Sequence, residues 1–155
     1  MKVALPIAEV FRFFEDPANL ARITPPSLGF EMTSGNLHMA PGLQIDYRIR
    51  WLGLPMRWTS LITAYDPPYK FVDEQLKGPY RYWQHRHEFT PLSDGTVIAD
   101  RVSYSLPLGP LGRIAQALVV RHQLLGIFNY RQRNVPEYLK ARCWQLETPN
   151  IRPVA

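Results

Sequence analysis

Residues 82–89 read Tyr-Trp-Gln-His-Arg-His-Glu-Phe, and their types and spacing could form the floor of a binding or catalytic site. Successive side chains of a strand point to opposite faces, so Trp83, His85, His87 and Phe89 would share one face. Two imidazoles between two large aromatic rings are typical of pockets that are mostly apolar and hold a few polar groups. Such pockets bind small molecules, so the segment predicts a ligand-binding cavity without identifying the ligand.

Neighbouring strands should add polar groups to the same cavity. By the same alternation, Asp100 and Tyr104 would face inward from one neighbouring strand, and Asp73 and Gln75 would face inward from the other. An earlier strand and a later helix should complete the wall. The predicted ligand-binding residues are Trp58, Gln75, Trp83, His85, His87, Phe89, Asp100, Tyr104 and His122.

Three interpretations of these polar residues are open. They could form a hydrogen-bonded network, because buried polar groups need partners. They could anchor the polar end of an apolar ligand. They could also do chemistry, because a histidine oriented by an aspartate can act as a general acid or base near neutral pH. In that case His85, His87 and Asp100 would be the catalytic residues.

A metal site formed by His85, His87 and His122 is conceivable, because residues two apart on a strand point the same way. A histidine metal site also needs supporting hydrogen bonds around its ligands, and the sequence shows none. We therefore expect no metal, and no pattern in the chain requires a cofactor.

The elements that must position these residues follow from the apolar periodicity and the turn signals. Short helices are predicted at 6–14 and 18–23, and strands at 28–34, 43–51, 56–65, 71–77, 83–89 and 96–106. A long helix is predicted from residue 111 to about 134, with His122, Leu125 and either Phe128 or Asn129 on its inward stripe. Pro136 should kink or restart this helix. The expected domain is residues 1–142, followed by an irregular tail at 143–155.

Length and composition restrict the class of protein. A chain of 155 residues with 46% apolar and 20% charged residues is typical of one globular domain. A single cysteine, Cys143, excludes an internal disulfide framework, and no apolar run resembles a signal peptide, so we expect a cytoplasmic location. The net charge of +5 is spread along the chain. Its one loose cluster, at residues 131–142, would be a solvated basic helix end, so nucleic-acid binding is not expected.

Several segments together resemble the SRPBCC superfamily, which includes START-type lipid carriers, birch-pollen-allergen-like proteins and aromatase/cyclases. The resemblance extends from residue 1 to about 142 and depends on residues 5–11, 19–26, 78–80, 83–89 and 100–104. It implies an α+β helix-grip fold, in which a curved antiparallel sheet wraps around a long C-terminal helix, with two short helices after the first strand. The chain departs from the family at its start, where only residues 1–5 are available for the first strand.

The predicted function is binding of a small hydrophobic or amphipathic molecule between the sheet and the long helix. A cyclase- or dehydratase-like enzyme that uses the histidine–aspartate pair is the first alternative. The second is an adaptor that touches a membrane surface weakly, or forms a homodimer, through its basic and apolar helix. The glycines of residues 109–112 suggest a lid over the cavity entrance.

Overall fold

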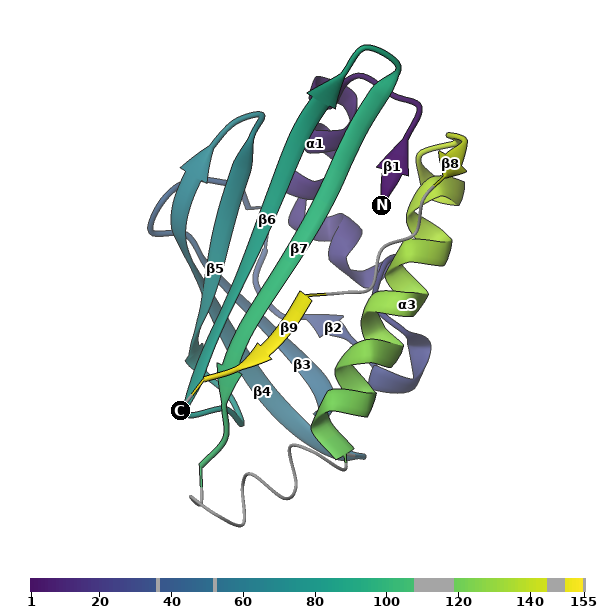
Figure 1. Ribbon diagram of the computed structural model, residues 1–155. Helices are drawn as coiled ribbons and strands as arrows, with labels where there is room; N and C mark the ends of the chain where they lie inside the picture. The colour runs from purple at the N-terminus through teal and green to yellow at the C-terminus, as the bar shows by residue number, and fades with distance from the viewer. Residues whose placement is uncertain (36, 52, 108–118, 145–149, 155) are drawn as a thin grey trace.

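The computed structural model describes residues 1–35, 37–51, 53–107, 119–144 and 150–154. Nine strands in this part of the chain form one sheet, which curves around the long helix α3 (Arg121–Tyr138) (Figure 1). The strands are β1 (Lys2–Val3), β2 (Glu31–Met32), β3 (Gln44–Trp51), β4 (Leu54–Asp66), β5 (Lys70–Lys77), β6 (Tyr82–Leu92), β7 (Gly95–Ser105), β8 (Cys143–Trp144) and β9 (Asn150–Pro153). Their order is β2-β3-β4-β5-β6-β7-β1-β8, with β9 beside β7. The predicted helix-grip α+β fold is confirmed.

Short helices precede the large strands. Helix α1 (Ile7–Glu15) follows Pro6 and buries Val10, Phe11 and Phe14 on one face. The predicted second helix is instead a 3-10 helix, η1 (Pro17–Ala21), and a further 3-10 turn, η2 (Pro26–Leu28), occupies the start of the predicted strand at 28–34. The prolines explain this outcome, because residues before a proline avoid α-helical angles.

The predicted irregular tail is wrong for the part of it that the structure describes. Strand β8 pairs antiparallel with β1, and β9 pairs parallel with β7 along residues 101–104. Strand β9 therefore lies where the short β1 leaves β7 uncovered, and β8 extends the sheet beyond β1. A sheet edge presents unpaired backbone groups, and these two segments satisfy part of that edge.

Alternation along the strands produces the inner and outer faces that the sequence predicts. In β6, His85, His87 and Phe89 are buried, and in β3, Arg48 and Arg50 are exposed. Register shifts in the β4–β5 pairing, between residues 59 and 60 and between 62 and 64, mark bulges. Bulges bend the strand that contains them, which helps the sheet to curve.

Helix α3 presents a different face from the predicted one. Its buried residues are Leu124, Phe128, Arg131 and Val135, whereas His122 is exposed. Pro136 lies inside the helix, which continues to Tyr138. The predicted start of this helix and the predicted lid at 109–112 lie outside the described residues. In the described part of the chain, no helix combines the length and the apolar character that a membrane span requires.

Candidate functional site

A cavity of about 160 Å³ lies between the concave face of the sheet and α3. It separates two clusters of buried side chains, one around Phe11 and Phe89 near α1, and one around Trp58 and Tyr104. Most of its wall is apolar, and nine aromatic rings contribute to it: Phe13, Phe14, Phe30, Tyr47, Trp58, Phe71, Tyr80, Trp83 and Phe128. The buried polar side chains of the wall include Ser60, His85 and His87 on the sheet and Arg131 on α3.

Four of the nine predicted ligand-binding residues line this cavity. They are Trp58 on β4 and Trp83, His85 and His87 on β6. Asp100 lies behind the two histidines, within hydrogen-bond distance of them, and is not part of the wall.

The other four predicted residues do not reach the cavity. Phe89 packs against Phe11, Phe14 and Phe71 in the core beneath α1. Tyr104 is fully buried in the second cluster, and His122 is exposed on α3. The alternation along a strand therefore identified the correct face for Phe89 and Tyr104 but not their position along the cavity.

Gln75 holds a loop instead of a ligand. Its Nε2 donates a hydrogen bond to the backbone oxygen of Tyr80 at 2.7 Å, and its Oε1 accepts one from the Tyr80 N–H at 3.2 Å. Both polar ends of the amide are thus used by the connection between β5 and β6. Gln75 therefore does not line the cavity, because the connection between β5 and β6 uses its side chain.

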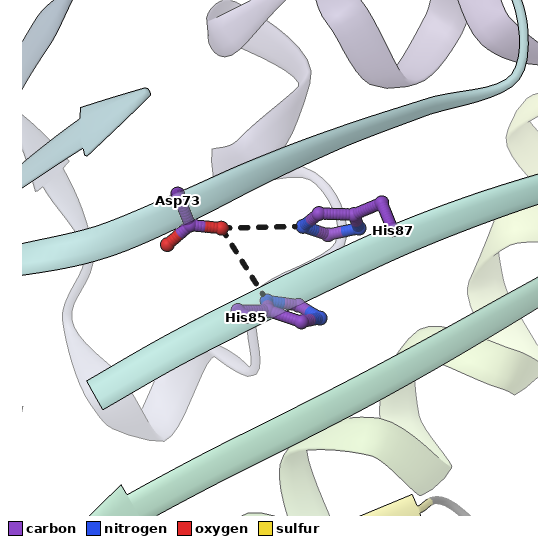
Figure 2. A group of neighbouring side chains, drawn as sticks. All are labelled: Asp73, His85 and His87. Atoms are coloured by element: carbon purple, nitrogen blue, oxygen red, sulfur yellow. Dashed lines mark hydrogen bonds and ion pairs between the residues drawn. The ribbon is translucent and has the colours of Figure 1, made fainter. Parts of the chain in front are cut away.

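Two aspartates surround the two histidines on the cavity floor. On one side, His87 Nε2 lies 3.3 Å and His85 Nδ1 lies 3.7 Å from Oδ2 of Asp73 (Figure 2). On the other side, His85 Nε2 lies 2.9 Å from Oδ1 of Asp100. His87 Nδ1 lies 3.0 Å from the same oxygen, at an angle that does not fit a hydrogen bond. All four ring nitrogens therefore face a carboxylate within 3.7 Å.

Strand register explains how the cluster forms. His85 is opposite Asp73 across the β5–β6 pairing, and His87 is opposite Asp100 across the β6–β7 pairing. Side chains directly opposite each other on one face of a sheet are close neighbours. Consecutive inward positions of β6 thus each receive a carboxylate from a different neighbouring strand.

A chain of hydroxyl contacts extends the cluster toward the other end of the cavity. Ser60 Oγ lies 3.5 Å from Oδ1 of Asp73 as a long donor contact, and it accepts a hydrogen bond from Trp58 Nε1 at 3.0 Å. The Tyr47 hydroxyl lies 3.2 Å from the same Ser60 oxygen. Ser60 therefore connects the tryptophan and tyrosine of the wall to the histidine–aspartate cluster.

Burial and these contacts shift the pKa values in different directions. Burial lowers the pKa of His85 to about 4, with the nearby His87 acting in the same direction. Burial also disfavours the charged form of His87, but the Asp100 and Asp73 carboxylates outweigh it and raise the His87 pKa. Burial opposes ionisation of Asp100 and Asp73 too, yet their histidine contacts hold both pKa values below the usual one. Near neutral pH the two aspartates are therefore carboxylates and His85 is neutral, while the aspartates shift His87 toward its charged form.

This arrangement suits a structural network better than proton transfer to a substrate. A general base needs a nitrogen within hydrogen-bond reach of the proton that it removes. Each ring nitrogen of His85 and His87 already faces an aspartate, and a histidine with a pKa of about 4 is a weak base at neutral pH. The cyclase-like alternative is not favoured by this geometry.

The same cluster is the group of side chains best placed to hold a metal. Asp73, His85 and His87 offer ligand atoms that all lie within 4.8 Å of one another, so Asp73 takes the position that the sequence assigns to His122. Protons shared between the histidines and the two aspartates can satisfy the same atoms without a cation.

Arg131 is a charged residue of the cavity that sequence reasoning missed. The predicted solvated basic end of the helix is wrong at this position, because Arg131 is 6% exposed and lines the cavity. It follows Phe128 by three residues and Leu124 by seven, which puts all three on one helical face. That spacing is the signal that could have found it.

A curved sheet that holds a helix against an internal cavity defines the class of helix-grip α+β proteins. Residues 3–127 match the family described as polyketide cyclase / dehydrase and lipid transport, and the chain belongs to this family. Among curated proteins, none matches the sequence.

Solved structures share the fold at low sequence identity. A nucleoside-diphosphate sugar epimerase from Corynebacterium glutamicum is 23% identical, with a TM-score of 0.65 over 90% of this chain, and the match spans only 28% of that protein. A protein from Thermus thermophilus is 17% identical, with a TM-score of 0.67, and the match covers 90% of this chain and 93% of that one. The protein Ara h 8.0201 is 16% identical, with a TM-score of 0.57 over the same shares of the two chains.

Proposed function

We propose that the protein binds a small, mostly apolar molecule in the cavity between the sheet and α3. The observation that carries this proposal is the cavity itself, which combines a wall of aromatic rings with a few polar groups from facing elements. Ligand sites in proteins commonly have this composition. The family description, which includes lipid transport, supports the same function.

The volume indicates a compact ligand. An apolar cavity of roughly 150 Å³ can hold a benzene molecule, and the cavity here is about 160 Å³. A small aromatic compound or a short alkyl chain therefore fits, and a longer molecule would need part of its length outside the enclosed space.

Two variants of α3 test this proposal with 1-octanol as the probe. Ile127 lines the cavity, whereas Leu125 is a half-buried residue of the same helix that does not. Ile127→Trp should fill the cavity and weaken octanol binding by roughly tenfold or more, since about 1.4 kcal/mol of lost contact produces that change. Leu125→Trp should bind octanol as the unaltered protein does.

Isothermal titration calorimetry measures both variants and the unaltered protein. Equal octanol affinities for Ile127→Trp and the unaltered protein would show that octanol binds elsewhere. If the unaltered protein bound no octanol, the proposed function would lose its support.

A further inference from the structure

Arg131 carries a buried positive charge that has no counter-ion in the described part of the chain. Its side chain is on the cavity-facing side of α3, and the residue is 6% exposed. Its Nε and Nη1 atoms are buried without a hydrogen-bond partner among the described residues. The guanidinium lies over the ring of Phe128, whose centre is 5.3 Å from the guanidinium carbon.

Such an arrangement is unfavourable in the empty protein. The guanidinium remains protonated at any ordinary pH. Burial of a charge costs free energy unless the charge is paired and hydrogen-bonded. Contact with one aromatic face offsets only part of that cost. The missing partner is therefore expected to enter with a ligand.

The aspartates on the cavity floor already contact histidines. Asp73 and Asp100 are held by His85 and His87, and no ion pair joins either one to Arg131 in the described residues. Arg131 contributes to the lowered pKa of Asp73 and opposes the rise in the Tyr47 pKa that burial causes, so its charge acts on the space between α3 and the cavity floor. A ligand group in that space would meet a cation whose Nε and Nη1 atoms make no hydrogen bond to the described residues.

A second polar group in the cavity is also without a partner. Gln123 precedes Arg131 by two helical turns on the same face of α3, and its Oε1 is buried with no hydrogen-bond partner among the described residues. Two unpartnered polar side chains along one cavity wall indicate a ligand that brings polar atoms with it.

We infer that Arg131 binds the carboxylate of a small amphipathic acid whose apolar part occupies the aromatic cavity. This inference rests on the proposed function and narrows its ligand class. The planar guanidinium has forked N–H pairs that match the two oxygens of a carboxylate. The wall beside it, at Ile127 and Phe128, suits the carbon skeleton of the acid.

Three probes of equal chain length separate the charge of the head group from the apolar body. Octanoate, 1-octanol and octylamine are titrated calorimetrically into the unaltered protein, Arg131→Met, Arg131→Lys and Arg133→Met. Arg133 is an exposed arginine two residues further along the same helix, so its variant is the matched control.

The unaltered protein should bind octanoate roughly 10- to 100-fold more tightly than 1-octanol, because a hydrogen bond to a charged group is worth about 1.5–3 kcal/mol. Octylamine should bind most weakly. Arg131→Met should abolish the preference for octanoate and retain octanol binding, Arg131→Lys should keep part of the preference, and Arg133→Met should keep all of it. The ligand-free melting temperature of Arg131→Met should not fall, because the variant removes an unpaired buried charge.

Other results identify which claim fails. Equal affinity of the unaltered protein for octanoate and 1-octanol, or an unchanged preference in Arg131→Met, would overturn the role of Arg131 and leave the proposed function standing. A lower ligand-free melting temperature of Arg131→Met would make Arg131 a structural residue and also count against the inference. Absence of binding of every probe to the unaltered protein would overturn the proposed function, and the inference with it. If Arg131→Met does not fold, the relative affinities of the unaltered protein for octanoate, 1-octanol and octylamine test the inference. Octanoate must then bind most tightly and octylamine most weakly.

Discussion

The buried histidines and the buried arginine of the cavity occupy two opposite walls. His85, His87 and Asp73 lie on the sheet side, and Arg131 lies on α3. The sheet-side residues and Asp100 contact one another, whereas the guanidinium makes no ion pair within 4 Å with any described residue. This difference assigns a structural role to the histidine–aspartate cluster and a recognition role to the arginine.

The titration of His85 predicts how stability depends on pH. Its pKa is about 4 in the folded protein, below its ordinary value of 6.5, so the unfolded chain binds more protons between these values. The free energy of unfolding should therefore fall as the pH drops from 6.5 toward 4, by at most about 3 kcal/mol. The raised pKa of His87 gives a contribution that is complete below pH 6.5 and is lost at higher pH.

Urea unfolding between pH 4.5 and 6.5 measures this slope. His85→Gln should remove most of it, and His38→Gln should not, because His38 is exposed. The same slope in His85→Gln and the unaltered protein would show that another group causes the pH dependence.

A second prediction at this scale concerns metals. Because protons can satisfy the three potential ligands Asp73, His85 and His87, we expect less than about 0.1 equivalent of Zn²⁺ after incubation with the metal and gel filtration. Plasma mass spectrometry measures the metal content. One equivalent of Zn²⁺ that disappears in His87→Gln would contradict this expectation.

The side-chain periodicity of each strand or helix determines which of its residues can face the site. The repeat of two in β3 and β6 predicted which side chains face inward, and His85 and His87 follow it. The repeat does not specify depth or register, so the pairing of His85 with Asp73 and the distance of Phe89 from the cavity could not be read from one strand. In α3, apolar residues on several sides left the rotation of the helix undetermined. The predicted stripe, with His122, differs by one residue from the observed stripe with Gln123, or by about 100° around the helix.

The observed rotation of α3 predicts opposite results for two aromatic side chains. Phe128 is 3% exposed, and its ring lies edge-on to His85 with the centres 5.3 Å apart. Phe128→Ala should lower the free energy of unfolding by about 3–5 kcal/mol, the usual cost of emptying a buried phenylalanine site. His122→Ala should change it by less than about 0.5 kcal/mol, because His122 is exposed.

Urea denaturation of both variants compares the two costs. A large loss in His122→Ala together with a small one in Phe128→Ala would contradict the observed rotation of the helix.

The whole molecule consists of two buried clusters joined through a curved sheet, with the cavity between them. The overall architecture followed from the order of helix, strand and turn signals and from the resemblance of a few segments. The parallel strand β9 did not, because its pairing with β7 joins segments about 50 residues apart and has no local signal. Arg131 was also missed, because an arginine in a basic helix end is ordinarily exposed.

Because the cavity lies between the two clusters, a ligand should stabilise the whole fold. At a free 1-octanol concentration of 100 times its Kd, the free energy of unfolding should rise by about 2.7 kcal/mol. Urea unfolding with and without octanol measures the increase, and Ile127→Trp should show much less of it. An equal increase in Ile127→Trp would place the binding outside the cavity.

The most direct test of a ligand site in this cavity is the nuclear magnetic resonance spectrum of the indole N–H groups during titration with 1-octanol. Trp58 and Trp83 line the cavity, whereas Trp144 lies on β8 and is 37% exposed. The indole signals of Trp58 and Trp83 should shift saturably and together, while that of Trp144 stays in place. A saturable shift of Trp144 alone, or no shift of Trp58 and Trp83 at saturating octanol, would contradict binding between the sheet and α3.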